Sequence, residues 1–169
     1  TNFQLAGNIW LRGILEEHYG VPHQSITWVV DRSEDVEFTP PPGLKIEMIP
    51  QGKHMDTMLA DGEIPAMINP YIPRPIVNSD PRVTRLFPDY KQVERDYFQQ
   101  TGIFPIMHVT VMKQEIVEKS PWAAVSLAKA FEKAKQVCYQ RVVNPRIVPL
   151  AWFSHQWDEE RKVLGPDPW

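Results

Sequence analysis

The stretch Thr101-Gly102-Ile103-Phe104-Pro105-Ile106-Met107-His108-Val109-Thr110-Val111-Met112-Lys113 decides how this chain is interpreted. It is opened by a glycine and a proline, and it is the longest run that is rich in β-branched residues, which favours a β-strand. Because nearly every position is apolar, we expect a strand that is buried on both faces, as in the middle of a parallel or mixed sheet.

His108 lies inside this apolar run. A buried imidazole needs a hydrogen-bond partner, because burying a polar group without one costs about 1–3 kcal/mol. Two interpretations follow from the residues alone. His108 is either a core histidine whose ring bonds a backbone carbonyl, or a titratable group in an active site.

Composition limits the class of protein. A chain of 169 residues can bury one sizeable core, which fits one domain or one large lobe. The net charge of −3, with both signs interspersed, gives no reason to expect nucleic acid or a membrane surface as a partner. The single cysteine, Cys138, cannot form a disulfide within the chain. No apolar run is long enough to span a bilayer, and the start shows no signal-peptide pattern.

Helices and strands alternate along the chain, which indicates an α/β architecture. Gly20 and Pro22 are the residue types that end a helix, so the first helix should stop there. In the helix at 121–143, the apolar spacing places Cys138 on a buried face, which disfavours a role as nucleophile. We expect helices at 5–19, 90–100, 114–119, 121–143 and 150–164, and strands at 26–30, 45–49, 64–69 and 103–112.

The beginning of the chain lacks a strand that would feed the first helix. Thr1 and Asn2 are N-cap residue types, so the sequence starts directly at a helix. An α/β fold normally places a strand before such a helix. We therefore expect residues 1–169 to be one lobe of a longer polypeptide.

Three polar residues are candidates for a binding site. Asn69 ends the strand at 64–69 and Arg74 follows it in a proline-rich loop, and ligands bind at the carboxyl ends of strands in open α/β sheets. A turn-forming role for Asn69 is an equal alternative. Arg12 lies two residues from the apolar stripe of the first helix, so it either covers the surface or faces a carboxylate. The chain has no glycine-rich phosphate loop, no metal-binding histidine pattern and no nucleophile elbow.

Several runs resemble one family of enzymes, the 4,5-dihydroxyphthalate decarboxylases, and the similarity extends over essentially the whole chain. The most specific run is 101–108. The others are Phe3-Gln4-Leu5, Ile9-Trp10-Leu11-Arg12-Gly13-Ile14-Leu15-Glu16, Tyr19-Gly20-Val21, the run 44–50, Leu59-Ala60-Asp61-Gly62-Glu63, Arg85-Leu86-Phe87-Pro88-Asp89-Tyr90, Tyr97-Phe98, Pro121-Trp122 and Lys129-Ala130-Phe131-Glu132-Lys133-Ala134-Lys135.

This resemblance implies a fold similar to the type II periplasmic solute-binding proteins. Residues 1–169 would form a three-layer lobe with a mixed, mainly parallel sheet flanked by helices. Family members are considerably longer, with an N-terminal lobe and a return segment that these residues lack. The partners expected are the missing lobe of the same polypeptide, a small aromatic dicarboxylate and a second copy in a homo-oligomer.

The activity implied by the resemblance is the non-oxidative loss of carbon dioxide from a hydroxylated aromatic dicarboxylate in the cytoplasm. The reaction needs no cofactor in principle, because a ring hydroxyl pushes electrons while a general acid protonates the ring carbon. His108 suits the role of acid. Gln4, Arg12, Asn69 and Arg74 are the residue types that hold carboxylates, Gln4 near a helix N-terminus. A rival interpretation is a non-catalytic solute-binding protein of the transporter type, because one fold hosts both functions.

Overall fold

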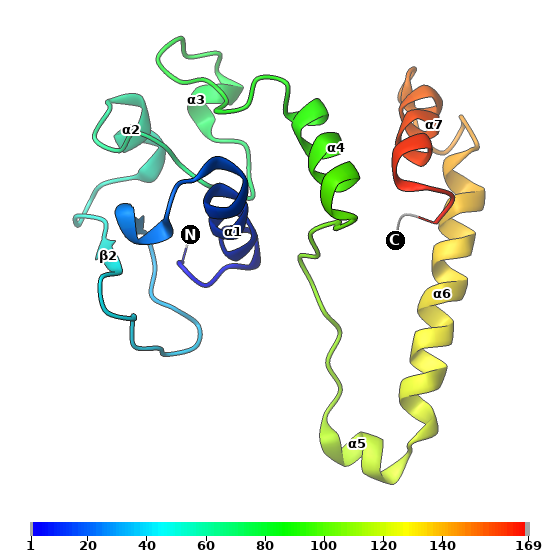
Figure 1. The fold of residues 1–169 in the computed structure, drawn as a ribbon. Helices are drawn as coiled ribbons and strands as arrows, with labels where there is room; N and C mark the ends of the chain where they lie inside the picture. The colour runs from blue at the N-terminus through cyan, green and yellow to red at the C-terminus, as the bar shows by residue number, and fades with distance from the viewer. Residues whose placement is uncertain (1, 168–169) are drawn as a thin grey trace. The chain divides into compact units, whose positions relative to one another are not determined.

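A computed structural model describes residues 2–167 of the chain (Figure 1). Residues up to Val93 together with 104–108 form one compact unit, and residues 94–103 together with those from Val109 onward form a second. We describe each unit by itself. The elements are α1 (Ala6–Tyr19), η1 (His23–Ser25), β1 (Thr27–Val30), β2 (Lys45–Met48), α2 (Met55–Ala60), α3 (Arg74–Val77), α4 (Tyr90–Thr101), α5 (Gln114–Lys119), α6 (Trp122–Val142) and α7 (Phe153–Leu164).

The first predicted helix is confirmed as α1, and it ends where the sequence indicated. Gly20 takes the left-handed conformation with φ of 65°, which glycine adopts without steric cost, and its N–H bonds the carbonyl of Leu15. The buried face differs from the expected apolar stripe. Ile9 is 53% exposed, whereas Asn8 is buried, with its Nδ2 donating to the carbonyl of Asn2 at 2.7 Å.

The strands predicted at 26–30 and 45–49 are confirmed as β1 and β2. They pair in parallel, with Thr27 opposite Lys45 and Val30 opposite Met48. The described residues contain no further strand in this sheet, so the sheet is much smaller than expected. The α/β class is confirmed at this coarser level. The strand predicted at 64–69 is wrong, because that segment follows α2 as turn and irregular backbone with prolines at both ends that lack an N–H to donate.

The prediction that 103–112 forms a buried central strand is wrong in the structure. The segment between α4 and α5 belongs to no sheet, and most of its side chains are exposed. Val109 is 74% exposed and Val111 is 85% exposed. The composition of a segment favours an extended backbone, but a strand also requires a neighbour whose N–H and C=O groups complete the ladder. The described residues provide no such neighbour here.

The core of the first unit is small and centres on Phe3. Phe3 is buried, with its ring edge-on to Trp28 at 5.8 Å and stacked on Phe38 at 5.9 Å. These contacts fix the turn before α1 against β1 and the loop that follows it. The other buried apolar side chains in the described part of the chain are Val30, Met58, Ile64 and Pro75.

In the second unit, the long helix predicted at 121–143 is confirmed as α6, which Figure 1 shows as an extended rod. Its expected buried face is wrong: Phe131 is 53% exposed and Cys138 is exposed. The apolar spacing identifies a helix face, but a partner must cover that face to bury it. The helix packs at its C-terminal part, where Tyr139 and Trp157 of α7 lie with ring centroids 5.5 Å apart.

Candidate functional site

The turn that leads into α1 is tied to the loop after β1 by one carboxylate. The backbone N–H of Phe3 donates to Oε1 of Glu34 at 2.6 Å, and the N–H of Gln4 donates to Oε2 at 2.9 Å. Two adjacent amides therefore hold both oxygens of one carboxylate. Such bonds are charge-assisted and stronger than neutral hydrogen bonds.

Two side chains of the same turn add further bonds to this loop. Nε2 of Gln4 donates to the carbonyl of Val36 at 3.3 Å, and Nδ2 of Asn2 donates to Oδ2 of Asp35 at 3.2 Å. Asn2 is 3% exposed, and its Oδ1 has no hydrogen-bond partner among the residues that the structure describes. Gln4 is half-buried. The amide side chains thus face the loop 34–36.

Arg12, one turn and a half along α1, reaches back to the same place. Its Nη1 donates to the carbonyl of Phe3 at 2.7 Å, and its guanidinium carbon lies 3.7 Å from the centre of the Phe3 ring. The ring of Trp28 lies 5.6 Å from the same carbon. Partial burial lowers the pKa of Arg12, and the charge of Glu34 opposes that shift. Arg12 remains a cation, because an arginine pKa lies far above neutrality.

The turn before α1 forms a binding site for a carboxylate, and the carboxylate that fills it is the side chain of Glu34. The site consists of the Phe3 and Gln4 amides and Arg12. Two N–H donors hold the oxygens of Glu34, while the guanidinium supplies a nearby positive charge. An arrangement of this kind can bind and orient a carboxylate. Its cation, Arg12, cannot serve as a proton donor to a ring carbon, since arginine does not titrate near neutrality.

Asn69 and Arg74 make local contacts. Oδ1 of Asn69 accepts from the N–H of Tyr71 at 3.2 Å, which is an Asx turn. This is the turn-forming alternative that the sequence left open. Arg74 begins α3, is exposed, and donates its backbone N–H to Oδ2 of Asp56 at 3.1 Å. That bond uses the backbone of Arg74 and leaves its guanidinium for other contacts.

His108 is exposed in the extended segment and not buried as expected. The prediction that His108 lies in a buried apolar strand is therefore wrong for the described residues. The segment 103–112 has no neighbouring strand among them to pair with. Nearby, the carbonyl of Ile106 accepts from Nε1 of Trp10 at 2.8 Å. That bond attaches the segment to α1 two residues before His108.

The structure brings together two of the five candidate residues. Gln4 and Arg12 both lie at the turn around Phe3, whereas no hydrogen bond or ion pair among the described residues joins Asn69, Arg74 or His108 to them or to one another. The sequence analysis missed Glu34. The acidic run at 31–35 was interpreted only as a charged loop, and no local pattern marks which of its carboxylates folds back onto backbone amides.

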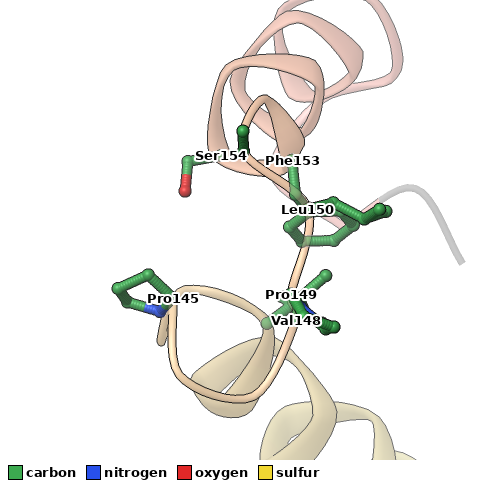
Figure 2. Close-up of a pocket in the computed structure, with 8 residues that line it drawn as sticks. Pro145, Val148, Pro149, Leu150, Phe153 and Ser154 are labelled. Atoms are coloured by element: carbon green, nitrogen blue, oxygen red, sulfur yellow. The ribbon is translucent and has the colours of Figure 1, made fainter.

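Two shallow hollows lie elsewhere, in the second unit. Figure 2 shows one of about 260 Å³ between the end of α6 and the start of α7. Its lining carries no ionisable side chain, so it offers neither a carboxylate donor nor a general acid. The lining residues are Val142, Pro145, Val148, Pro149, Leu150, Ala151, Phe153 and Ser154. A more open hollow of about 390 Å³ is lined by Asp158, Arg161, Lys162 and Pro166 of the α7 region.

Residues 2–167 hold neither a metal cluster nor a membrane-spanning helix. Within that range, His, Cys, Asp and Glu side chains nowhere gather in threes with a geometry suited to a metal ion. The helices of the same range are all too short or too polar to cross a bilayer.

Comparison with known proteins identifies relatives of one kind. A 4,5-dihydroxyphthalate decarboxylase of Comamonas testosteroni is 33% identical over an alignment of 175 residues. The alignment covers 99% of this chain and 53% of the relative. A 4,5-dihydroxyphthalate decarboxylase of Pseudomonas putida is 30% identical over 103 residues, covering 57% of this chain and 40% of the relative. No protein-family model matches the chain.

The first of these similarities covers nearly the whole of an α/β chain and places it among proteins related to carboxy-lyases. The chain belongs to the 4,5-dihydroxyphthalate decarboxylase family. It spans about half the length of the curated relatives that it matches.

Proposed function

We propose that the protein to which this chain belongs removes carbon dioxide from 4,5-dihydroxyphthalate or a close hydroxylated aromatic dicarboxylate, without oxidation. The observation that carries the proposal is the 33% identity over 99% of the chain to a decarboxylase of that substrate. The relatives give no support to the rival function, a non-catalytic solute-binding protein. We place the enzyme in the cytoplasm.

The reaction assigns distinct roles to the candidate residues. A ring hydroxyl supplies electron density to the carbon that bears the carboxylate, His108 delivers a proton to that carbon, and the bond to the carboxylate then breaks to release carbon dioxide. The exposed position of His108 leaves its imidazole accessible to a substrate. Histidine suits this role because its ordinary pKa lies near neutrality.

We assign the substrate carboxylates to Gln4, Arg12, Asn69 and Arg74. The support is firmest for the turn before α1, where two amides and Arg12 already surround a carboxylate, that of Glu34. A substrate carboxylate would fit the same donors if Glu34 moved away. The Arg74 guanidinium adds a second cation for the other carboxylate, and Asn69 offers the amide Nδ2 that its Asx turn leaves over.

We further propose that the chain is one lobe of a two-lobed protein with the fold of the type II periplasmic solute-binding proteins. Exposed apolar side chains support this. Trp122 is 69% exposed, Phe131 is 53% exposed and Val111 is 85% exposed. A second lobe, and a second copy in a homo-oligomer, are partners that would cover such surface.

The test is incubation of the full-length protein with 4,5-dihydroxyphthalate, with release of carbon dioxide measured by a coupled or isotopic assay. We expect one equivalent of carbon dioxide and of the monocarboxylic product for each substrate consumed. Phthalate, which lacks the hydroxyls, is the matched control and should bind without turnover. Binding of both compounds with turnover of neither would overturn the proposal and favour a solute-binding function.

A further inference from the structure

The loop at 31–40, which follows β1, places both a carboxylate and an aromatic ring against the turn before α1. The Glu34 carboxylate accepts from the N–H groups of Phe3 and Gln4 at 2.6 and 2.9 Å. Further along the same loop, the ring of Phe38 is stacked on the ring of Phe3, with centroids 5.9 Å apart and planes inclined by 6°. The short segment 34–38 therefore presents to the turn the two groups that an aromatic carboxylate carries.

Side chains, and not backbone pairing, hold this loop in place. Residues 32–40 lie outside the helices and strands, and they make no backbone–backbone hydrogen bond to the residues that the structure describes. Further hydrogen bonds to the turn run from Nδ2 of Asn2 to Oδ2 of Asp35 and from Nε2 of Gln4 to the carbonyl of Val36. Segments with few backbone bonds open locally, at a free energy below that of global unfolding. Opening of the loop therefore costs side-chain contacts and leaves the hydrogen bonds of α1 and β1 intact.

The turn has supports of its own that do not involve the loop. Nη1 of Arg12 donates to the carbonyl of Phe3 at 2.7 Å, and the Arg12 guanidinium lies against the Phe3 ring. The ring of Trp28 meets the Phe3 ring edge-on at 5.8 Å, and Nδ2 of Asn8 donates to the carbonyl of Asn2 at 2.7 Å. Two N–H donors, a cation and a ring thus remain preorganised for another ligand when the loop opens.

A buried acceptor of the same turn lacks a donor. Asn2 is 3% exposed, and its Oδ1 has no hydrogen-bond partner among residues 2–167. The same side-chain amide meets the loop at Asp35 through Nδ2. A buried oxygen without a hydrogen bond is costly and therefore calls for a partner. A ligand with a hydroxyl group offers the donor that the loop does not supply.

We propose that the segment 34–38 is an internal substitute for the substrate, and that an aromatic carboxylate binds at the turn by displacing it. The ligand carboxylate replaces that of Glu34 on the amides of Phe3 and Gln4, and the ligand ring replaces that of Phe38 on Phe3. Glu34 and Phe38 are then internal competitors that set the affinity of the site, and Phe3 selects an aromatic ligand. The identity of the ligand rests on the proposed function, whereas the displacement itself does not require decarboxylation.

The size of the expected effect follows from this competition. An internal ligand reduces the apparent affinity for an external one by the fraction of molecules in which the site is open. Glu34→Gln removes the charge and one acceptor oxygen, so we expect the dissociation constant of phthalate to fall by about 10-fold. Phe38→Ala removes the competing ring, and the constant should fall by roughly 2- to 10-fold.

Calorimetric titration of the full-length protein with phthalate tests the proposal. Phthalate carries the ring and both carboxylates and should bind without turnover. Glu37→Gln is the matched control, because Glu37 is an exposed carboxylate of the same loop, and it should leave the dissociation constant unchanged. Unchanged or weaker binding in either Glu34→Gln or Phe38→Ala would overturn the proposal, because the loop would then build the site or lie outside it.

Limited proteolysis of the wild-type protein decides the matter if a variant fails to fold. Arg32 lies in the loop with its side chain 54% exposed, so trypsin can cut after it. Cleavage tracks the population of the open loop, and saturating phthalate should therefore accelerate cleavage at Arg32 by at least about 3-fold. Sodium chloride at equal ionic strength is the control. Unchanged or slower cleavage with phthalate would mean that the loop stays in place over the ligand, which contradicts displacement.

Release of carbon dioxide from 4,5-dihydroxyphthalate is scored separately and distinguishes the two proposals. Tighter phthalate binding in both variants, with no carbon dioxide released by the wild type, would refute the proposed function and leave the displacement standing. Release of carbon dioxide by the wild type, with no gain in phthalate affinity in the variants, would refute the displacement and leave the function standing.

Discussion

Removing the carboxylate of Glu34 should destabilise the first unit more than any other single change in its loop. Glu34 accepts two backbone N–H bonds, from Phe3 and from Gln4. Hydrogen bonds to a charged group contribute about 1.5–3 kcal/mol each. Because Glu34 is half-exposed, water regains part of this hydrogen-bond energy when the two bonds are lost. We therefore expect Glu34→Ala to lower the free energy of unfolding by roughly 2–3 kcal/mol. Glu34→Gln keeps one acceptor oxygen and should cost about half as much.

Urea unfolding, followed by NMR at the amides of residues 2–30, measures this effect in the first unit alone. With a urea dependence of about 1–3 kcal/mol per molar, the Glu34→Ala midpoint should fall by roughly 1 M. Glu37→Gln is the matched control, because Glu37 is an exposed acidic residue of the same loop with no hydrogen bond or ion pair to the residues that the structure describes. A Glu34→Ala midpoint within about 0.2 M of the wild type would refute the reasoning, as would an equal loss in Glu37→Gln.

Three further predictions concern single residues. Cys138 is exposed and should react with a maleimide in the folded protein at the rate of a free thiol, whereas complete protection would mean that α6 is covered. Hydrogen bonds from Arg82 lower the pKa of Asp80 from its ordinary value to about 2. The stability that this pair contributes is therefore fully present above about pH 4 and is lost as the pH falls through 2. Arg82→Gln should move the NMR titration midpoint of Asp80 back up toward about 4. In the full-length enzyme, His108→Asn should reduce turnover by roughly 10²-fold with substrate binding largely kept, and near-wild-type turnover would assign the proton to another group.

The sequence predicted the helices well because their signals are local. Gly20 and Gly102, both with positive φ, end α1 and α4 within a residue of the expected places, and Pro121 precedes α6. A helix completes its hydrogen bonds within its own segment, so the residues of that segment suffice to identify it. The apolar spacing of α6 was recognised correctly as helical, but its burial depends on elements elsewhere, and Cys138 is exposed.

Side-chain contacts at the candidate residues could be anticipated only where a side chain bonds its own neighbourhood or a nearby turn. Asn69 forms the Asx turn that its residue type favours, and Arg12 returns to the turn before α1 across less than three helical turns. Glu34 escaped prediction because its bonds to Phe3 and Gln4 span about thirty residues of sequence. Contacts at that separation depend on how β1 and α1 pack, which residue types do not encode one at a time.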